Sequence, residues 1–429
     1  MNLFENKLTI FLIIITLSTF LAGCGGGGGS VSNIYSSSND ANAIKPAVLT
    51  SHQNLFVNEA KADYAINPDS PQANFKMAIA ESFLNLSNNG ELNTLSNNLY
   101  QDGKEISPTL SDLMKTVVSK DGYSPSVTFS SGLNIAAAII KLNAFGTTTT
   151  FAKLQDTIQD FMIPALDKEI SYLRKCETAS FQYTNTRLYF KKLFKINDYV
   201  ASDPLDNTEY MLDQSDAYIL DGLLLLNKSA IHFACAFNFD ATQSTDVYND
   251  VTNVFKLRDS SNPAGKGAAN LKAARENFAL SLEKISIAAG LRMQNPAITK
   301  KLFWDQSSGG QAFNLIKTQL GYIVSALRAG GSYKLSSPEL SSSAYIMVNF
   351  SAWENNPGAV DLKIYLKALN AMDSQSTDTA SYDFSLGGLF PECTSKQAAN
   401  NKIDGLKQQN LGATLNEWQT IMGNMQSGW

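Results

Sequence analysis

Few residues in this sequence have the types and spacing that catalysis requires. Only two histidines occur, His52 and His232. Two are too few for a histidine metal cage, and they leave little material for a Ser-His-Asp or Cys-His site. His232 lies within a long apolar run. We therefore expect it to be a hydrogen-bonded core residue and not a general base.

Other patterns with catalytic precedent are weak. Ser281 and Lys284 have the SxxK spacing, in which one helical turn brings a lysine to a serine, but no SDN or KTG element follows. Close acid pairs such as Asp213 and Asp216 are unavoidable among 39 acidic residues, and we interpret this pair as loop and helix-cap residues. We expect no enzyme activity, no cofactor and no metal site.

Three cysteines lie beyond residue 24, at Cys176, Cys235 and Cys393. No two of them have CxxC spacing, so neither a redox motif nor a zinc ribbon is indicated. An oxidising compartment would allow one disulfide and leave one thiol over. Cys235 lies in an apolar helical stretch and should pack as a small hydrophobe. Cys176–Cys393 is then the favoured pair, although the sequence alone allows three pairings.

The composition argues against a nucleic-acid partner. The net charge is −5, only 17% of residues are charged, and no basic cluster occurs. The chain is rich in serine, asparagine and threonine. This composition suits an exported surface protein better than a cytosolic enzyme.

The first 24 residues resemble the export signal of a bacterial lipoprotein. The apolar run from Leu8 to Leu21 is shorter than a membrane span of ~20 residues but fits the core of a signal peptide. It ends in LAGC, which resembles a lipobox. The resemblance implies a signal peptide over residues 1–23 and a diacylglycerol on the Cys24 sulfur. The alternative is an ordinary signal peptide with an incidental cysteine.

Residues 24–50 are expected to form the lipidated cysteine and a flexible tether. Five glycines follow Cys24, and serine and asparagine dominate the rest. Such a segment cannot bury enough apolar surface to offset its ordering. Since Gly25 and not aspartate follows the cysteine, the sorting rules of enteric bacteria favour the outer membrane. We expect a cell-envelope protein, anchored in the outer membrane through Cys24, with its body on the periplasmic or the surface face.

The body, residues 51–429, is expected to be mainly α, as a multi-helix bundle or a short helical array with one or two small β-hairpins. Apolar residues recur at helical spacing, and Pro164 is expected to break one such pattern. A sub-boundary is conceivable near 255–267, which is rich in serine, asparagine and glycine. The predicted helices lie within 107–120, 73–87, 150–162, 166–173, 268–285, 313–327, 362–369 and 415–422.

Residues 217–239 are apolar nearly all round and long enough to cross a bilayer. Asp221 and Lys228 interrupt them, and each charge near the bilayer centre would cost ~2.5–3.5 kcal/mol. We therefore expect a buried helix at the centre of an all-α body, capped by Ser215 or Asp216. Strand signals are confined to TRLYF, EYML (209–212) and AYIMVNF (344–350).

Residues 59–81 resemble the join between two tetratricopeptide repeats. One helix ends at AINPDSP, Pro68 and Pro71 turn the chain, and a new helix starts with Ala73 and Phe75. The resemblance implies paired helices that stack into a concave surface for peptides or partner proteins. No second copy occurs at the 34-residue period. The wider layout resembles uncharacterised helical envelope lipoproteins of bacteria, from which no catalytic residue can be carried over.

Residues 382–400 form an irregular segment that is unusually apolar for a loop. Phe384, Leu389 and Phe390 lie close to two consecutive glycines. They allow two interpretations, a loop that contacts a partner or a loop held on the core by its aromatic residues. We favour the second.

Together these observations predict a lipid-anchored envelope protein that binds or scaffolds a protein, a peptide or an exported solute. The alternatives are a carboxylate-dependent hydrolase of the envelope and a purely structural assembly subunit. A pocket lined by convergent carboxylates would favour the hydrolase, and a large flat apolar patch would favour the assembly subunit.

Overall fold

The computed structural model describes residues 49–87, 151–194, 207–238, 256–294, 321–335 without 322, 345–362, 364–365, 368 and 382–408. Within these ranges the protein is mainly helical, with two small antiparallel pairs of strands. This confirms the predicted fold class. The predicted helices at 107–120 and 415–422, most of the predicted helix at 313–327, and the anchor at Cys24 lie outside the described residues.

The N-terminal part is a pair of helices, α2 (Ser51–Ile66) and α3 (Pro71–Ser87). Thr50 and Gln53 form a capping box, in which each side chain accepts a hydrogen bond from the other residue's backbone N–H. The chain turns after Ile66 and re-enters a helix at Pro71, as predicted, because proline fits the first helical position. The buried face of α3 includes Phe75, Ile79 and Phe83, also as predicted.

Helix α7 (Phe151–Cys176) corrects one prediction. Pro164 lies inside it and does not end it. Pro164 is exposed, so the carbonyl that loses its intrahelical donor faces water. The buried stripe also continues past the proline, since Met162 and Leu166 both pack into the core at the spacing of one turn.

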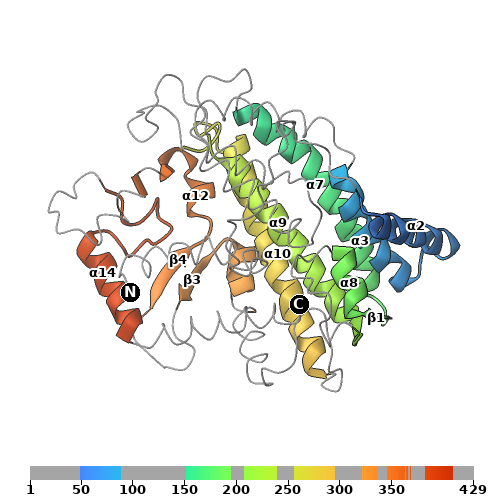
Figure 1. Ribbon diagram of the computed structural model, residues 1–429. Coiled ribbons are helices and arrows are strands. Elements are labelled where there is room, and N and C mark those ends of the chain that lie inside the picture. The colour runs from blue at the N-terminus through green and yellow to red at the C-terminus, as the bar shows by residue number, and fades with distance from the viewer. Residues whose placement is uncertain are drawn as a thin grey trace, which may run out of the picture.

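Helices α9 (Gln214–Ala236) and α10 (Lys266–Gln294) lie side by side through the centre of the molecule (Figure 1). Gly222 permits this contact, because a Cβ there would lie 2.9 Å from Ile285 Cγ1. By length and composition α9 could cross a membrane, but 83% of its most apolar window is buried inside the protein. The prediction of a buried central helix is confirmed. The predicted cap was wrong, since Asp213 is the N-cap and Asp216 completes its capping box.

The two strand pairs are β1 (Gln182–Thr186) with β2 (Glu209–Asp213), and β3 (Ser332–Leu335) with β4 (Ile346–Asn349). The EYML and AYIMVNF segments form strands as predicted. The TRLYF segment does not, because the chain turns into helix α8 (Arg187–Phe194) after Thr186. Thr186 Oγ1 accepts a hydrogen bond from Tyr189 N, as a helix cap does.

The C-terminal elements are α12 (Ala352–Asn355), the 3-10 helix η1 (Pro357–Ala359) and α14 (Lys396–Gln408). With β3 and β4 they lie across α9 and α10 from the α2–α3 pair (Figure 1). The segment 256–265, near the predicted sub-boundary, is tied to the end of α9, because the buried Leu257 forms a β-bridge with Phe237.

Candidate functional site

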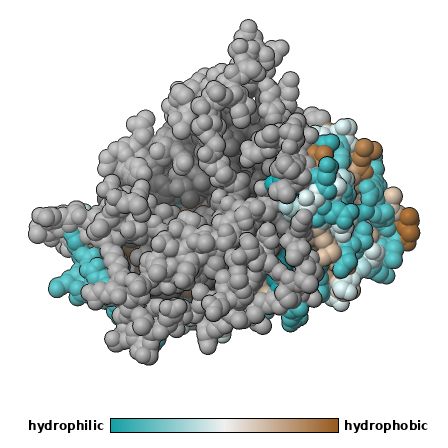
Figure 2. Space-filling model, turned by 60° about the horizontal axis from the view of Figure 1, so that its bottom comes forward, coloured by the Kyte–Doolittle hydropathy of each residue, from teal (hydrophilic) through white to brown (hydrophobic). Residues whose placement is uncertain are grey.

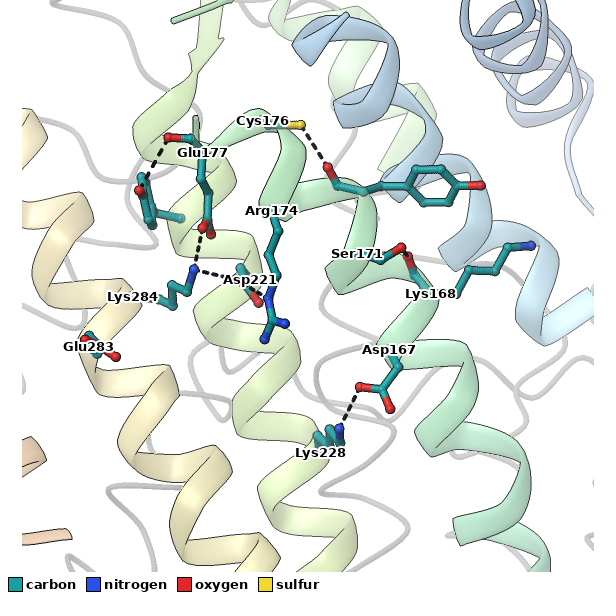
Figure 3. A network of polar contacts seen from close by, with 12 residues as sticks. Asp167, Lys168, Ser171, Arg174, Cys176, Glu177, Asp221, Lys228, Glu283 and Lys284 are labelled. Atoms are coloured by element: carbon teal, nitrogen blue, oxygen red, sulfur yellow. Dashed lines mark hydrogen bonds and ion pairs between the residues drawn. The ribbon is translucent and has the colours of Figure 1, made fainter. Parts of the chain in front are cut away.

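A buried cluster of charges joins three helices at one end of the core. We call it the charge cluster and define it as Glu177, Asp221 and Lys284. Glu177 follows α7, Asp221 lies on α9 and Lys284 on α10, and their charged groups point toward one another (Figure 3). Lys284 Nζ lies 3.1 Å from Asp221 Oδ2 and in direct contact with Glu177 Oε2. The side chain of Asp221 is 0% exposed and that of Glu177 is 8% exposed.

Burial and the neighbouring acid change the proton affinity of this cluster. Desolvation, together with the hydrogen bond and charge of Asp221, raises the pKa of Glu177 to about 7, against the opposing pull of Lys284. Burial alone would lower the pKa of Lys284, but its hydrogen bond to Glu177 and the charge of Asp221 outweigh burial and raise it. Glu177 therefore exchanges its proton near neutral pH while Lys284 stays charged.

Other protein groups surround the charge cluster and contact its members. Lys284 Nζ lies 5.2 Å from the ring centroid of Tyr218, and Gln214 Nε2 donates a hydrogen bond of 2.5 Å to the Glu177 backbone carbonyl. Arg174 Nε approaches Asp221 Oδ2 at 4.0 Å from the exposed side. Two carboxylates with one raised pKa have the chemistry of a general acid–base pair, but here their charges are compensated inside the protein.

The SxxK spacing has a structural explanation. Lys284 directs its ammonium group to the two carboxylates of the charge cluster. Ser281 lies one turn earlier and is fully buried, and its hydroxyl has no hydrogen-bond partner among the described residues. The structure therefore gives no support to a serine activated by this lysine.

A second buried ion pair stabilises the start of α9. Arg292 Nη2 lies 2.5 Å from Asp216 Oδ1, and both side chains are almost completely buried. Asp216 also accepts a hydrogen bond from Asp213 N, while Asp213 accepts one from Ser215 N. The acid pair thus serves in helix capping, as the sequence predicted.

His232 is a core residue, which confirms the prediction. Its Nδ1 lies 2.8 Å from Asn270 Oδ1, and burial lowers the pKa of the imidazole below its usual value. Asn270 in turn donates to Gln159 Oε1 at 3.2 Å. His52 packs edge-on against the Tyr189 ring at 4.8 Å. The two histidines lie in separate contacts and do not form a site together.

Cys176, Cys235 and Cys393 are free and buried, so the favoured Cys176–Cys393 disulfide is not formed in this structure. Cys176 ends α7 beside the α2–α3 pair, where its Sγ donates to Pro71 O at 3.1 Å. Cys393 comes shortly before α14 in the sequence, and α14 lies across α9 and α10 from α2 and α3 (Figure 1). The Cys176–Cys393 pair was favoured only because Cys235 was assigned to the core, and that argument says nothing about the distance between the other two cysteines.

The irregular segment near residue 385 packs onto the core. Phe384, Leu389 and Phe390 are all buried, so they are not available to a partner in this structure. Trp353 Nε1 donates a hydrogen bond of 2.6 Å to Leu386 O, which holds the turn against α12. The interpretation of a loop held by its aromatic residues is confirmed.

Among the described residues, no group of three or more histidine, cysteine or acidic side chains is arranged to hold a metal ion. No family model, curated protein or solved structure matches this chain. The resemblances to lipoproteins and to tetratricopeptide repeats therefore remain predictions from the sequence.

Proposed function

We propose that this chain is a lipid-anchored protein of the cell envelope, attached to the outer membrane through Cys24, whose helical body is a binding or scaffold module for a protein, a peptide or an exported solute. The sequence up to Cys24 carries this proposal, because an apolar run followed by LAGC and five glycines suits an acylated cysteine on a tether. The first described helix begins at Ser51, where the tether was expected to end.

The charge cluster favours binding over catalysis. A catalytic acid has to reach its substrate, whereas Asp221 is fully buried and Glu177 nearly so. Both acids share one lysine from a third helix. Such a buried cluster fixes how α7, α9 and α10 meet, because removing Lys284 leaves two buried carboxylates without the cation that contacts both. The arrangement supports a rigid helical body more than a hydrolase.

The proposal can be tested by crosslinking intact envelopes and purifying the full chain with whatever it holds. The Cys24→Ser variant is the matched control, since it changes the anchor and not the body. We expect a reproducible partner or solute with the wild-type chain and its depletion with the variant. Purification without any partner, together with hydrolysis of envelope material that Glu177→Gln abolishes, would overturn the binding proposal in favour of the hydrolase.

A further inference from the structure

The outer face of α2 carries an exposed apolar line, which we call the α2 ridge and define as Leu55, Ala62 and Ile66. Spacings of seven and four residues place the three on one line of a helix. Leu55 is 68% exposed and Ile66 is 84% exposed. The other exposed large hydrophobic residues in the described part of the chain, Ile287 and Ile364, are 38% and 36% exposed. Two of the four therefore share one helix face.

Figure 2 shows separate brown apolar spots among hydrophilic teal at the side of the molecule that carries α2 and α3 in Figure 1. A soluble protein often exposes single hydrophobic residues. Leu55 and Ile66 differ from such single residues because they lie on the same line of one helix, and a partner surface would explain their exposure.

The charges around the ridge are already compensated. Lys76 of α3 is almost buried, and its Nζ lies 2.8 Å from Asp63 Oδ2 and in direct contact with Glu59 Oε1. Lys76 thus forms ion pairs with both acids of α2, Glu59 and Asp63. Lys61 adds an exposed positive charge on the same helix. Helix α2 and Lys76 of α3 together therefore carry no net charge that an anionic lipid surface would repel.

The position of α2 in the sequence indicates which surface the α2 ridge contacts. Only 26 residues separate Cys24 from Ser51. A random-coil chain of this length has a root-mean-square span of about 28 Å, and α2 is the described helix that follows Cys24 most closely in the sequence. At this range the contact is intramolecular, with an effective concentration in the millimolar range. A high effective concentration lowers the contact area that is needed to orient the body.

We propose that the α2 ridge is a membrane-contact surface, which lays the helical body against the same phospholipid surface that holds the acyl chains of Cys24. This inference rests on the proposed lipid anchor. It adds that the body does not stand clear of the bilayer but meets it with one defined face. Leu55 and Ile66 insert at the level of the lipid head groups, and α3 and α7 lie behind them.

The test uses the full acylated chain in vesicles of phosphatidylethanolamine and phosphatidylglycerol. An environment-sensitive fluorophore is attached to Leu55→Cys, and the matched control carries it at Ile287→Cys on α10. Both positions are exposed, so both variants should fold, and the native thiols beyond Cys24 are buried and react slowly. Circular dichroism verifies that each labelled chain has wild-type helicity.

We expect spin-labelled lipids to quench the fluorophore at position 55 several-fold more than the one at position 287. Equal quenching at both positions in protein that floats with the vesicles would overturn this inference and leave the anchor standing. A blue shift at position 55 that depends on protein concentration and not on quencher would assign the ridge to a second copy and also overturn it. Protein that does not float would remove the anchor, and this inference with it.

Discussion

Replacing Lys284 by methionine tests whether the charge cluster holds the core together. Methionine keeps most of the length of the side chain and removes its charge. Asp221 and Glu177 would then lose the cation that contacts both of them. Arg174 would remain 4.0 Å from Asp221, and its side chain is 55% exposed, so it compensates the buried carboxylate less than Lys284 does.

The magnitude follows from the burial of the partners. Removing one member of a buried pair costs about 3–5 kcal/mol, and Asp221 is 0% exposed. We expect the lower end near pH 6, where Glu177, with a pKa raised to about 7, is mostly protonated and adds no second charge. The matched control is Lys228→Met on α9. Its partner Asp167 is 51% exposed at 2.6 Å, so the loss should be about 0–1 kcal/mol.

The assay is chemical unfolding of the purified full chain in mild detergent, followed by circular dichroism at pH 6 and pH 8. Lys284→Met should lower the free energy of unfolding several-fold more than Lys228→Met, and its loss should be larger at pH 8. Two lysine variants of equal stability, or a Lys284→Met chain within about 1 kcal/mol of wild type, would refute the reasoning. Loss of the cation beside a buried carboxylate should destabilise the protein by more than that.

Three further predictions concern other features of the body. Because burial and Asp221 raise the pKa of Glu177 from 4.5 to about 7, its stabilising effect is complete below pH 4.5 and is lost as pH rises through 7. In the wild-type chain the free energy of unfolding should therefore fall by about 3 kcal/mol between pH 4.5 and pH 7, and in Glu177→Gln it should not. A Glu177→Gln chain that shows the same fall would contradict this prediction. Gly387 has φ +67° and a Cβ there would overlap the Tyr365 hydroxyl, so Gly387→Ala should cost about 2–4 kcal/mol in thermal or chemical unfolding. Helical Gly321 has open space around it, and Gly321→Ala should instead stabilise by up to about 1 kcal/mol, so equal effects would count against the turn geometry. Burial raises the pKa of the three free thiols to about 11 or 12, so they should resist alkylation at pH 8 until denaturant is added, which mass spectrometry can follow.

The sequence predicted correctly those features that depend on residues close together in the chain. The apolar run at 217–239 predicted a buried helix, and the proline turn at 67–71 predicted the end of one helix and the start of the next. Both signals depend on residues within a few turns of each other. Asp221 and His232 interrupted the apolar run, and these are the positions where other helices supply polar partners.

The charge cluster could not be predicted in the same way. Glu177 and Lys284 are separated by 107 residues, and their pairing depends on how α7 and α10 pack around α9. The SxxK spacing was misleading here, since it associated Lys284 with Ser281. A charged residue on an otherwise apolar helix does indicate that an opposite charge must lie nearby, but it does not identify which one.

Two local predictions failed for reasons of tertiary structure. Pro164 was expected to end a helix, but its position on the exposed side lets α7 continue. The TRLYF segment has strand composition, yet its Phe190 and the later Leu193 are both fully buried at helical spacing. Burial in the core outweighs intrinsic strand preference there.

The measurement that tests the central claim most directly is the intact mass of the N-terminal peptide from membrane-extracted protein. A lipid-anchored chain should begin at Cys24 and carry the added mass of a diacylglycerol and its amide-linked fatty acid, and Cys24→Ser should lack both additions. A wild-type N-terminal peptide with no added mass, identical to that of Cys24→Ser except for the substituted atom, would contradict the anchor and the location that follows from it.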